Sequence, residues 1–176
     1  MISLEKLDSA GLARETEALA GVLHACVHDG ASVGFAWPFP LEEARAFWTG
    51  PVASALAKRG RHVLAARLGG RVVGTAQLDC AAMPNQHHRA DVMKVLVHPG
   101  ARRRGIARLL MLELETIARA EGRWLLVLDT RVGDPAQAMY EALGYSLAGI
   151  IPGYARAPDG SDRYDATAYM FKDLQA

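Results

Sequence analysis

The stretch Val92–Leu110, VMKVLVHPGARRRGIARLL, decides the fold class of this chain. Its pattern predicts an apolar strand, a break at Pro99-Gly100, a basic loop with one glycine, and then an amphipathic helix. Such a join brings free backbone N–H groups and the positive end of a helix dipole to one point, where anions bind. The arginines of the loop add positive charge there. The stretch therefore predicts a site for a phosphate-bearing ligand, and the alternative is a basic surface cluster at an ordinary helix start.

The composition of the chain excludes several classes of protein. Its 176 residues suffice for one domain with a core, predicted over residues 1–176, and 51% of them are hydrophobic. The formal net charge of +1 gives no overall attraction to nucleic acid or to an anionic membrane. The amino-terminal residues contain no signal-peptide core, and no apolar run reaches the length of a membrane span. Cys26 and Cys80 lack metal-type spacing, so we expect reduced, buried cysteines in a cytoplasmic protein.

Hydrophobic periodicity predicts helices and strands along the whole chain. Gly69-Gly70 predicts a hairpin turn, and Asp134-Pro135 predicts a helix start with Asp134 as the cap. The predicted strands are Ile2–Leu7, Arg61–Leu68, Arg71–Cys80, Arg89–Val97, Trp124–Leu128, Tyr145–Ile151 and Ala166–Lys172; the predicted helices are Gly11–His28, Leu41–Lys58, one from Ile106 that Gly122 stops, and one from Pro135 to Leu143. The order β-α-α-β-β-β-α-β-α-β-β predicts a mixed α/β fold in which a crossover helix makes the Val92 and Trp124 strands parallel.

The basic loop and its flanks resemble the GNAT superfamily of N-acetyltransferases. Residues Arg102–Ala107, RRRGIA, fit the Arg/Gln-x-x-Gly-x-Gly/Ala pattern of the pyrophosphate loop in these enzymes, and the predicted element order is that of the GNAT fold. The resemblance implies an N-acetyltransferase with acetyl-CoA as co-substrate. The backbone of Val95–Val97 would pair with the pantetheine arm, and an N–H near Val95 or Leu96 would stabilise the oxyanion. The residues that the resemblance implies in acetyl-CoA binding are Val95, Leu96, Val97, Arg102, Arg103, Arg104, Gly105, Ile106 and Ala107.

A second signature of the same superfamily surrounds Tyr140. Ala136-x-x-x-Tyr140-Glu141-x-x-Gly144-Tyr145 is similar to the family's Ala-x-x-Leu-Tyr-Glu-x-x-Gly-Phe. The resemblance implies that Tyr140 lies beside the coenzyme A sulfur as a general acid. A phenol suits this task because its ordinary pKa of about 10 keeps the proton on the oxygen at neutral pH. The alternative is a tyrosine that only packs, and Gly133 departs from the Asn that many members carry there.

A narrower resemblance, to GNAT enzymes of the tabtoxin-resistance type, extends over the loops on the substrate side. It implies that Asp91 and Asp129 act with Tyr140 on the amine of a small amino-acid-like, antibiotic-like or toxin-like molecule. This chain has aspartate at position 91 where that type has glutamate, and its Ala155–Asp165 loop is slightly longer. The stretches that carry the resemblance are Gly30–Phe35, His88–Val92, Leu128–Thr130, Pro152–Tyr154 and Pro158–Gly160.

Acid–base chemistry explains why two carboxylates would be useful. An amine arrives as ammonium and must lose a proton before it attacks a thioester, and a carboxylate can hold the cation and take that proton. Each acid could instead cap a strand or pair with an arginine such as Arg89 or Arg131. Phe35 and Tyr154 are further candidates for contact with the acceptor. If the acceptor also carries an anion, the candidate receptors are Arg89, Arg131, Arg156 and Arg163.

Several functions stay open at this point. A protein or peptide acetyltransferase of the same fold would need an open groove where this chain has the Gly30–Phe39 and Ala155–Asp165 loops. A catalytically silent acyl-CoA-binding sensor and a nucleic-acid binder using Arg102–Arg108 are two further candidates. We expect a small-molecule amine as partner, with neither nucleic acid nor membrane, and the oligomeric state, including a homodimer, stays open. We also expect no metal, because His87-His88 has no third ligand at useful spacing.

Overall fold

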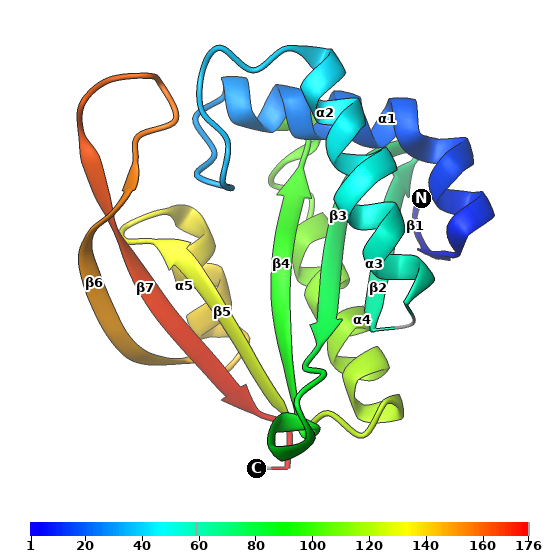
Figure 1. Ribbon diagram of the computed structural model, residues 1–176, viewed down its shortest axis with the longest axis vertical. Helices are drawn as coiled ribbons and strands as arrows, with labels where there is room; N and C mark the ends of the chain where they lie inside the picture. Colours follow the sequence, from blue (N-terminus) through cyan, green and yellow to red (C-terminus); the bar gives the residue numbers. More distant parts are fainter. Residues whose placement is uncertain (59, 176) are drawn as a thin grey trace.

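The computed structural model describes residues 1–58 and 60–175, and its centre is a seven-stranded sheet of order β1-β2-β3-β4-β5-β7-β6 (Figure 1). The strands are β1 (Ile2–Leu7), β2 (Arg61–Leu68), β3 (Arg71–Cys80), β4 (Arg89–Val97), β5 (Leu125–Arg131), β6 (Ser146–Arg156) and β7 (Tyr164–Asp173). The helices are α1 (Ser9–His28), α2 (Leu41–Phe47), α3 (Ala53–Ala57), α4 (Ile106–Ala120) and α5 (Pro135–Ala142). None of the helices in the described ranges is long and apolar enough to cross a membrane.

The pairing of the strands confirms the predicted mixed α/β fold. Strands β1 to β4 form an antiparallel meander, and the turn at Gly69-Gly70 joins β2 to β3 with both glycines at positive φ. Strands β4 and β5 are parallel, as the crossover through α4 requires. Strand β7 then pairs with both β5 and β6 in antiparallel fashion, so β6 is an edge strand.

Two layers of helices cover the two faces of the sheet. Figure 1 shows α1, α2 and α3 in front of the sheet and α4 behind it. The front layer packs through a cluster that includes Leu19, Leu23 and Trp48, and the rear layer through one that includes Leu110, Leu114 and Leu126. Cys26 and Cys80 are buried and free, as predicted. The core thus holds β4 between two packed layers, which fixes its position for the site described below.

The second predicted helix is interrupted. The sequence predicts one helix over Leu41–Lys58, whereas α2 ends at Phe47 and a π-helical segment, Trp48–Val52, separates it from α3. Pro51 lies inside that segment and has no N–H to donate, so the regular hydrogen-bond pattern cannot continue through it. The fully buried Trp48 holds this segment against α1 and the sheet.

The last strands are longer than the sequence predicts. Strand β6 continues to Arg156 and β7 begins at Tyr164, and the register shifts between Ile151 and Ala155. The prediction stops β6 before Pro152, but an edge strand tolerates a proline because one of its sides needs no hydrogen-bond donor. Strand β5 also continues beyond Leu128 to Arg131, and only alternate residues of its apolar run are buried. The apolar run of β5 is therefore fully buried on one face, through Leu126 and Leu128, and only partly buried on the other.

Candidate active site

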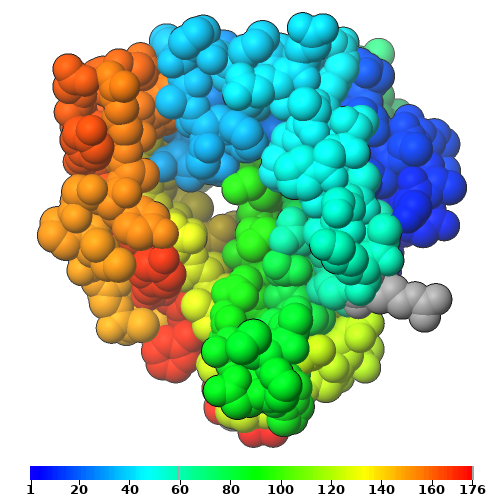
Figure 2. All heavy atoms as spheres, in the orientation of Figure 1, coloured from blue at the N-terminus to red at the C-terminus, as the bar shows by residue number. Residues whose placement is uncertain are grey.

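The central feature of the molecule is the parting of β4 from β5. The two strands pair only through Arg89–Asp91 and Leu125–Val127, and beyond Asp91 they diverge. A cavity of about 850 Å³ occupies the opening, within the usual size of a small-molecule site. Figure 2 shows the molecule hollowed between β4 and the β6–β7 hairpin, below the loop that follows α1. The walls come from the end of α1 and its loop (Cys26, Asp29–Gly34), β4 (Val92–Val97), the basic loop and α4 (Arg102, Arg103, Gly105–Arg108), β5 and α5 (Asp129–Arg131, Asp134–Ala136, Met139, Tyr140), and the last hairpin (Tyr154, Ala155, Asp165–Thr167).

A β-bulge shapes the wall that β4 contributes. Met93 pairs with Gln77 and Leu96 pairs with Thr75, so Lys94 and Val95 together oppose one residue of β3. Lys94 has a φ of 52°, a left-handed conformation that costs a non-glycine residue roughly 1–2 kcal/mol. Bulges leave backbone groups outside the ladder and redirect side chains. The bulge therefore offers the cavity both unpaired backbone and the side chain of Lys94.

The basic loop has the backbone that its glycine predicts. Gly105 adopts φ 77° and caps α4 from a left-handed conformation, without any side-chain hydrogen bond to the first turn of the helix. Gly105, Ile106 and Ala107 line the cavity, so the amino-terminal turn of α4 faces it. A helix start of this kind is a site for phosphate oxygens.

The three consecutive arginines of this loop have different environments. Arg102 lines the cavity but forms an ion pair with Asp29 and donates from Nε to the carbonyl oxygen of Val97 at 3.2 Å. Arg103 lines the cavity, and Arg104 does not. Arg108, one turn into α4, supplies a further cation to the wall. Arg102 therefore ties the loop to α1, and the charges available to a ligand are those of Arg103 and Arg108.

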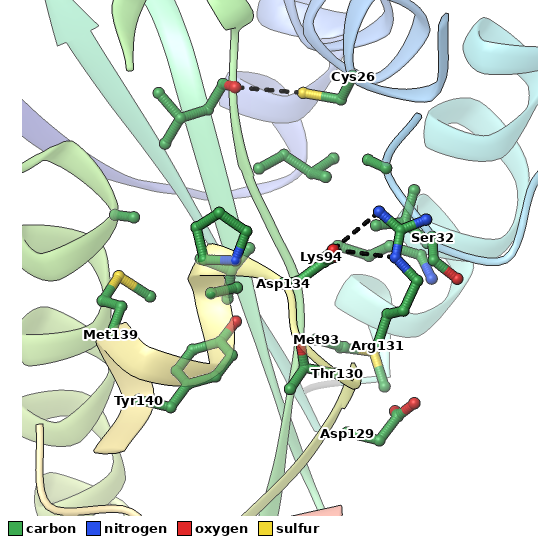
Figure 3. Close-up of a pocket in the computed structure, with 18 of the residues that line it drawn as sticks. Cys26, Ser32, Met93, Lys94, Asp129, Thr130, Arg131, Asp134, Met139 and Tyr140 are labelled. Carbon is green, nitrogen blue, oxygen red and sulfur yellow. Dashed lines mark hydrogen bonds and ion pairs between the residues drawn. The ribbon is translucent and has the colours of Figure 1, made fainter. Parts of the chain in front are cut away.

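Tyr140 is one of the residues of α5 that line the cavity. It is buried, and Figure 3 shows its ring and the side chain of the neighbouring Met139 on one side, with Ser32 and Arg131 on the other. Burial raises the pKa of Tyr140 well above its ordinary value, and the charges of Asp129 and Asp134 add to this effect. The hydroxyl therefore keeps its proton throughout the neutral range.

The two candidate acids differ in position. Asp129 lines the cavity, and its Oδ2 lies 3.0 Å from the hydroxyl of Thr167. Asp91 is absent from the cavity wall and is bound by Arg89, whose Nη1 lies 2.6 Å and 2.7 Å from its two oxygens. Burial raises the pKa of Asp91, while the positive charge of Arg89 opposes that rise. The structure thus places Asp129 on the cavity wall. Asp91 lies off the wall and forms an ion pair with Arg89, which is the alternative role that the sequence also allowed.

A hydrogen bond joins two loops near the cavity. The backbone N–H of Trp37 in the α1–α2 loop donates to the carbonyl oxygen of Pro158 in the β6–β7 loop at 2.9 Å. Tyr154 lines the cavity, and its hydroxyl lies 2.8 Å from that of Tyr169. Phe35 is not on the wall itself and packs instead against Phe39 and Phe47. The loops that a peptide groove would need open are therefore bridged.

Sequence reasoning missed several residues of the wall. Lys94, Asp134 and Thr167 line the cavity, and so does Arg131, which the sequence offered as a candidate receptor for an anion of the acceptor. Lys94 carried a usable signal, because a lysine inside the apolar run of a central strand needs a structural reason.

The carboxylate of Asp134 corrects one prediction. Helix α5 starts at Pro135 as predicted, but the side chain of Asp134 makes no capping hydrogen bond to it. Its Oδ1 instead accepts two hydrogen bonds from Arg131, at 2.9 and 2.8 Å. Two hydrogen bonds from a cation bind a carboxylate more strongly than one from a neutral amide, which explains why Asp134 binds Arg131 and does not cap the helix. Figure 3 shows this pair at the cavity wall.

The adjacent histidines lie away from the cavity wall. The ring of His88 stacks on Trp124 at a centroid distance of 4.6 Å, and Nδ1 of His87 lies 3.1 Å from the carbonyl oxygen of Pro84. Within residues 1–58 and 60–175, His, Cys, Asp and Glu side chains form no group of three that could hold a metal ion.

Comparisons with known proteins agree with this geometry. An uncharacterized N-acetyltransferase from the hisH–hisA intergenic region of Azospirillum brasilense is 37% identical over 105 residues, which are 57% of this chain and 60% of that protein. The N-terminal acetyltransferase B complex catalytic subunit naa20 of Schizosaccharomyces pombe is 36% identical over 86 residues, 47% of this chain and 48% of that protein. The chain thus spans about half to three fifths of the length of these relatives. The structure of yncA, a putative acetyltransferase from Salmonella typhimurium with acetyl-CoA, is 18% identical at a TM-score of 0.75, covering 99% of this chain and 94% of that one, and shows the same fold.

The structure thus combines a sheet that splits between β4 and β5, a bulge in β4 and a glycine–arginine loop at the start of α4. Residues 27–145 match the model of the acetyltransferase (GNAT) family. That match covers more than half of the chain, and the chain belongs to this family.

Proposed function

We propose that the protein is an acetyl-CoA-dependent N-acetyltransferase that transfers the acetyl group directly to a small amine. The observation that carries this proposal is the split between β4 and β5, which ends at the loop Arg102–Ala107 and encloses Tyr140 and Asp129 in one cavity. Family membership and the acetyl-CoA in the structure of yncA support the choice of co-substrate.

The residues on the cavity wall fit acetyl-CoA. Gly105, Ile106 and Ala107 would meet the pyrophosphate with backbone N–H groups, and Arg103 and Arg108 would add positive charge. Because β4 has no strand partner beyond Asp91 on its β5 side in the described structure, Val95, Leu96 and Val97 would pair with the amide-rich pantetheine arm as a strand would. Arg102 would act indirectly, by holding the loop to α1 through Asp29.

The reaction then needs three proton transfers and the stabilisation of one oxyanion. The ammonium of the acceptor gives a proton to Asp129, directly or through water, and the free amine attacks the thioester carbonyl. A backbone N–H at the bulge, near Val95 or Leu96, stabilises the negative oxygen that forms. The new N–C bond stays while the C–S bond breaks, and Tyr140 gives its proton to the leaving thiolate. The attacking nitrogen, positively charged once the N–C bond has formed, loses its second proton, which returns to the Tyr140 oxygen directly or through water, and Asp129 releases the first proton to solvent. The products are the N-acetyl compound and coenzyme A.

Asp91 has a supporting place in this scheme. Asp91 pairs in register with Val127, two residues before Asp129, so the side chains of Asp91 and Asp129 lie on the same face of the sheet. Held by Arg89, it would keep the face next to Asp129 acidic and would not itself take the proton.

A contact between two loops near the cavity supports a small acceptor. The contact between Trp37 and Pro158 bridges the two loops across which a peptide would have to lie. We therefore favour an amino-acid-like or toxin-like amine, as in the tabtoxin-resistance type. A peptide amino terminus is the second candidate, because a relative 36% identical over 86 residues is the catalytic subunit naa20 of an N-terminal acetyltransferase complex.

An acceptor screen tests the proposed function. The purified chain is mixed with acetyl-CoA and separate panels of amino acids, simple amines and short peptides, and release of the coenzyme A thiol is measured. We expect turnover with members of the small-amine panels. Turnover confined to peptides would support the second candidate, and binding of acetyl-CoA without turnover on any panel would indicate a silent acyl-CoA sensor.

Asp129→Asn should lower kcat/KM for the best acceptor by about 10²–10⁴-fold, the usual effect of losing a general base. Because asparagine keeps the shape of the side chain, acetyl-CoA affinity should not change. Activity should partly recover at higher pH, where more acceptor is already a free amine. The matched variant is Asp91→Asn, which should cost much less because Asp91 is off the cavity wall. Equal effects of the two variants on the pH–rate profile would contradict the division of roles.

A further inference from the structure

The acceptor side of the cavity contains one cation that the proposed reaction does not use, Lys94. The bulge of β4 turns this residue to a φ of 52° and places it on the cavity wall. Its ammonium lies 5.8 Å from the ring centroids of both Phe35 and Phe47. A Cβ added at Gly34 would lie 3.7 Å from Nζ, so the α1–α2 loop passes directly over it. Lys94 therefore lies between the α1–α2 loop and the cavity.

The surroundings of Lys94 lack a carboxylate partner. In the described parts of the chain, residues 1–58 and 60–175, it takes part in no ion pair and no side-chain hydrogen bond. Burial lowers the pKa of Lys94, the charge of Asp129 raises it, and the charge of Arg61 lowers it further. An ammonium that exchanges water for aromatic rings loses part of its hydration, and a bound anion would compensate for that loss.

The arginines that could have received an anion from the acceptor already have partners. Arg89 binds Asp91, Arg131 binds Asp134, Arg156 binds Asp162 and Arg163 binds Asp165. The unpaired cations of the loop, Arg103 and Arg108, lie at the start of α4, where the pyrophosphate is proposed to bind. Among the described residues of the cavity wall, Lys94 is therefore the cation that has no ion-pair partner and lies outside the proposed pyrophosphate site.

We propose that Lys94 binds a carboxylate, or an anion of the same shape, that the acceptor carries beside its reacting amine. The inference rests on the proposed function and adds the residue that selects the acceptor. Asp129 and Lys94 would then hold the two ends of a zwitterion, the ammonium and the carboxylate. Such an arrangement favours an amino acid over the amine that lacks only the carboxylate, because each buried charge meets its opposite.

Matched acceptor pairs test this inference. The probes are L-alanine with ethylamine, L-phenylalanine with phenethylamine, and L-2,4-diaminobutyrate with 1,3-diaminopropane, each assayed by thiol release from acetyl-CoA. The wild-type protein should prefer the carboxylated member of the pairs it accepts. Lys94→Met should raise KM for that member by about 10- to 100-fold, the usual range for losing a bond between charged groups, and change it less than threefold for the decarboxylated partner.

Three controls separate this role from others. Lys94→Arg keeps the charge and should retain most of the preference, and Lys6→Met changes an exposed lysine off the cavity wall and should have no effect. Unchanged acetyl-CoA affinity of Lys94→Met would show that its site is still folded. Equal losses on both members of each pair, or no wild-type preference, would overturn the inference while leaving the transferase intact. Turnover on no acceptor at all would overturn the proposed function and the inference with it.

Discussion

Gly105→Glu should abolish measurable binding of acetyl-CoA. The substitution puts a carboxylate at the start of α4, where the proposed pyrophosphate would approach the backbone. Two unit charges about 4 Å apart near a protein surface repel by about 4 kcal/mol, which is roughly a thousandfold in affinity. Calorimetric titration with acetyl-CoA measures the loss.

The matched control for this variant is Gly122→Glu. Gly105 and Gly122 lie at opposite ends of α4, both have positive φ, 77° and 69°, and a Cβ at either would meet no atom within 4 Å. The two variants therefore introduce the same side chain and similar backbone strain, and only one adds charge to the cavity. We expect Gly122→Glu to bind acetyl-CoA within about threefold of wild type. If Gly105→Glu bound equally well, the pyrophosphate could not lie on this loop.

Tyr140→Phe should lower kcat by about 10²–10⁴-fold with little change in acetyl-CoA affinity. The variant removes one hydroxyl and keeps the buried ring, so packing on α5 is preserved. The loss is expected because the thiolate would leave without a proton donor. Burial and the charges of Asp129 and Asp134, which raise the pKa of Tyr140, ensure that the wild-type hydroxyl is protonated wherever the enzyme is assayed near neutral pH.

Tyr145→Phe provides the control for that experiment. Its ring centroid lies 5.9 Å from that of Tyr140, and it is also buried. The hydroxyl of Tyr145 is buried without a hydrogen-bond partner among the described residues, and Tyr145 does not line the cavity. Its loss should leave kcat unchanged and leave stability unchanged or slightly higher, since an unsatisfied buried hydroxyl is removed. Equal rates for wild type and Tyr140→Phe would reduce Tyr140 to a packing residue.

The sequence by itself determined the element order and the parts of the site that lie close together along the chain. Strand β4, the glycine at position 105 and helix α4 follow one another directly, so local spacing was enough to predict a phosphate-binding join. The same holds for Pro135 at the start of α5, and for Tyr140 within it. In each case the backbone conformation depends on residues within one or two turns.

Positions that depend on distant partners were decided by the tertiary structure. The sequence could not show that β4 and β5 part after Asp91, because strand divergence depends on how α4, α5 and the last hairpin pack. That divergence puts Asp129 on the cavity wall and leaves Asp91 beside it, although the two acids looked equivalent in sequence. Similarly, Asp29 forms an ion pair with Arg102, and Asp134 forms one with Arg131. These two arginines are therefore not free to bind the charge of a ligand.

Lys94 shows the physical reason for this division. Along the sequence it is one polar residue in an apolar strand, and periodicity alone predicts neither its direction nor its neighbours. Four separate segments of the chain form the surroundings of Lys94. They contribute the bulge opposite β3, the rings of Phe35 and Phe47, and the charge of Asp129. Local propensity is a property of neighbouring residues, whereas burial and charge pairing depend on which segments meet in space. The sequence therefore determined the loop that would hold the phosphates, and only the fold decided which charges remain for the acceptor.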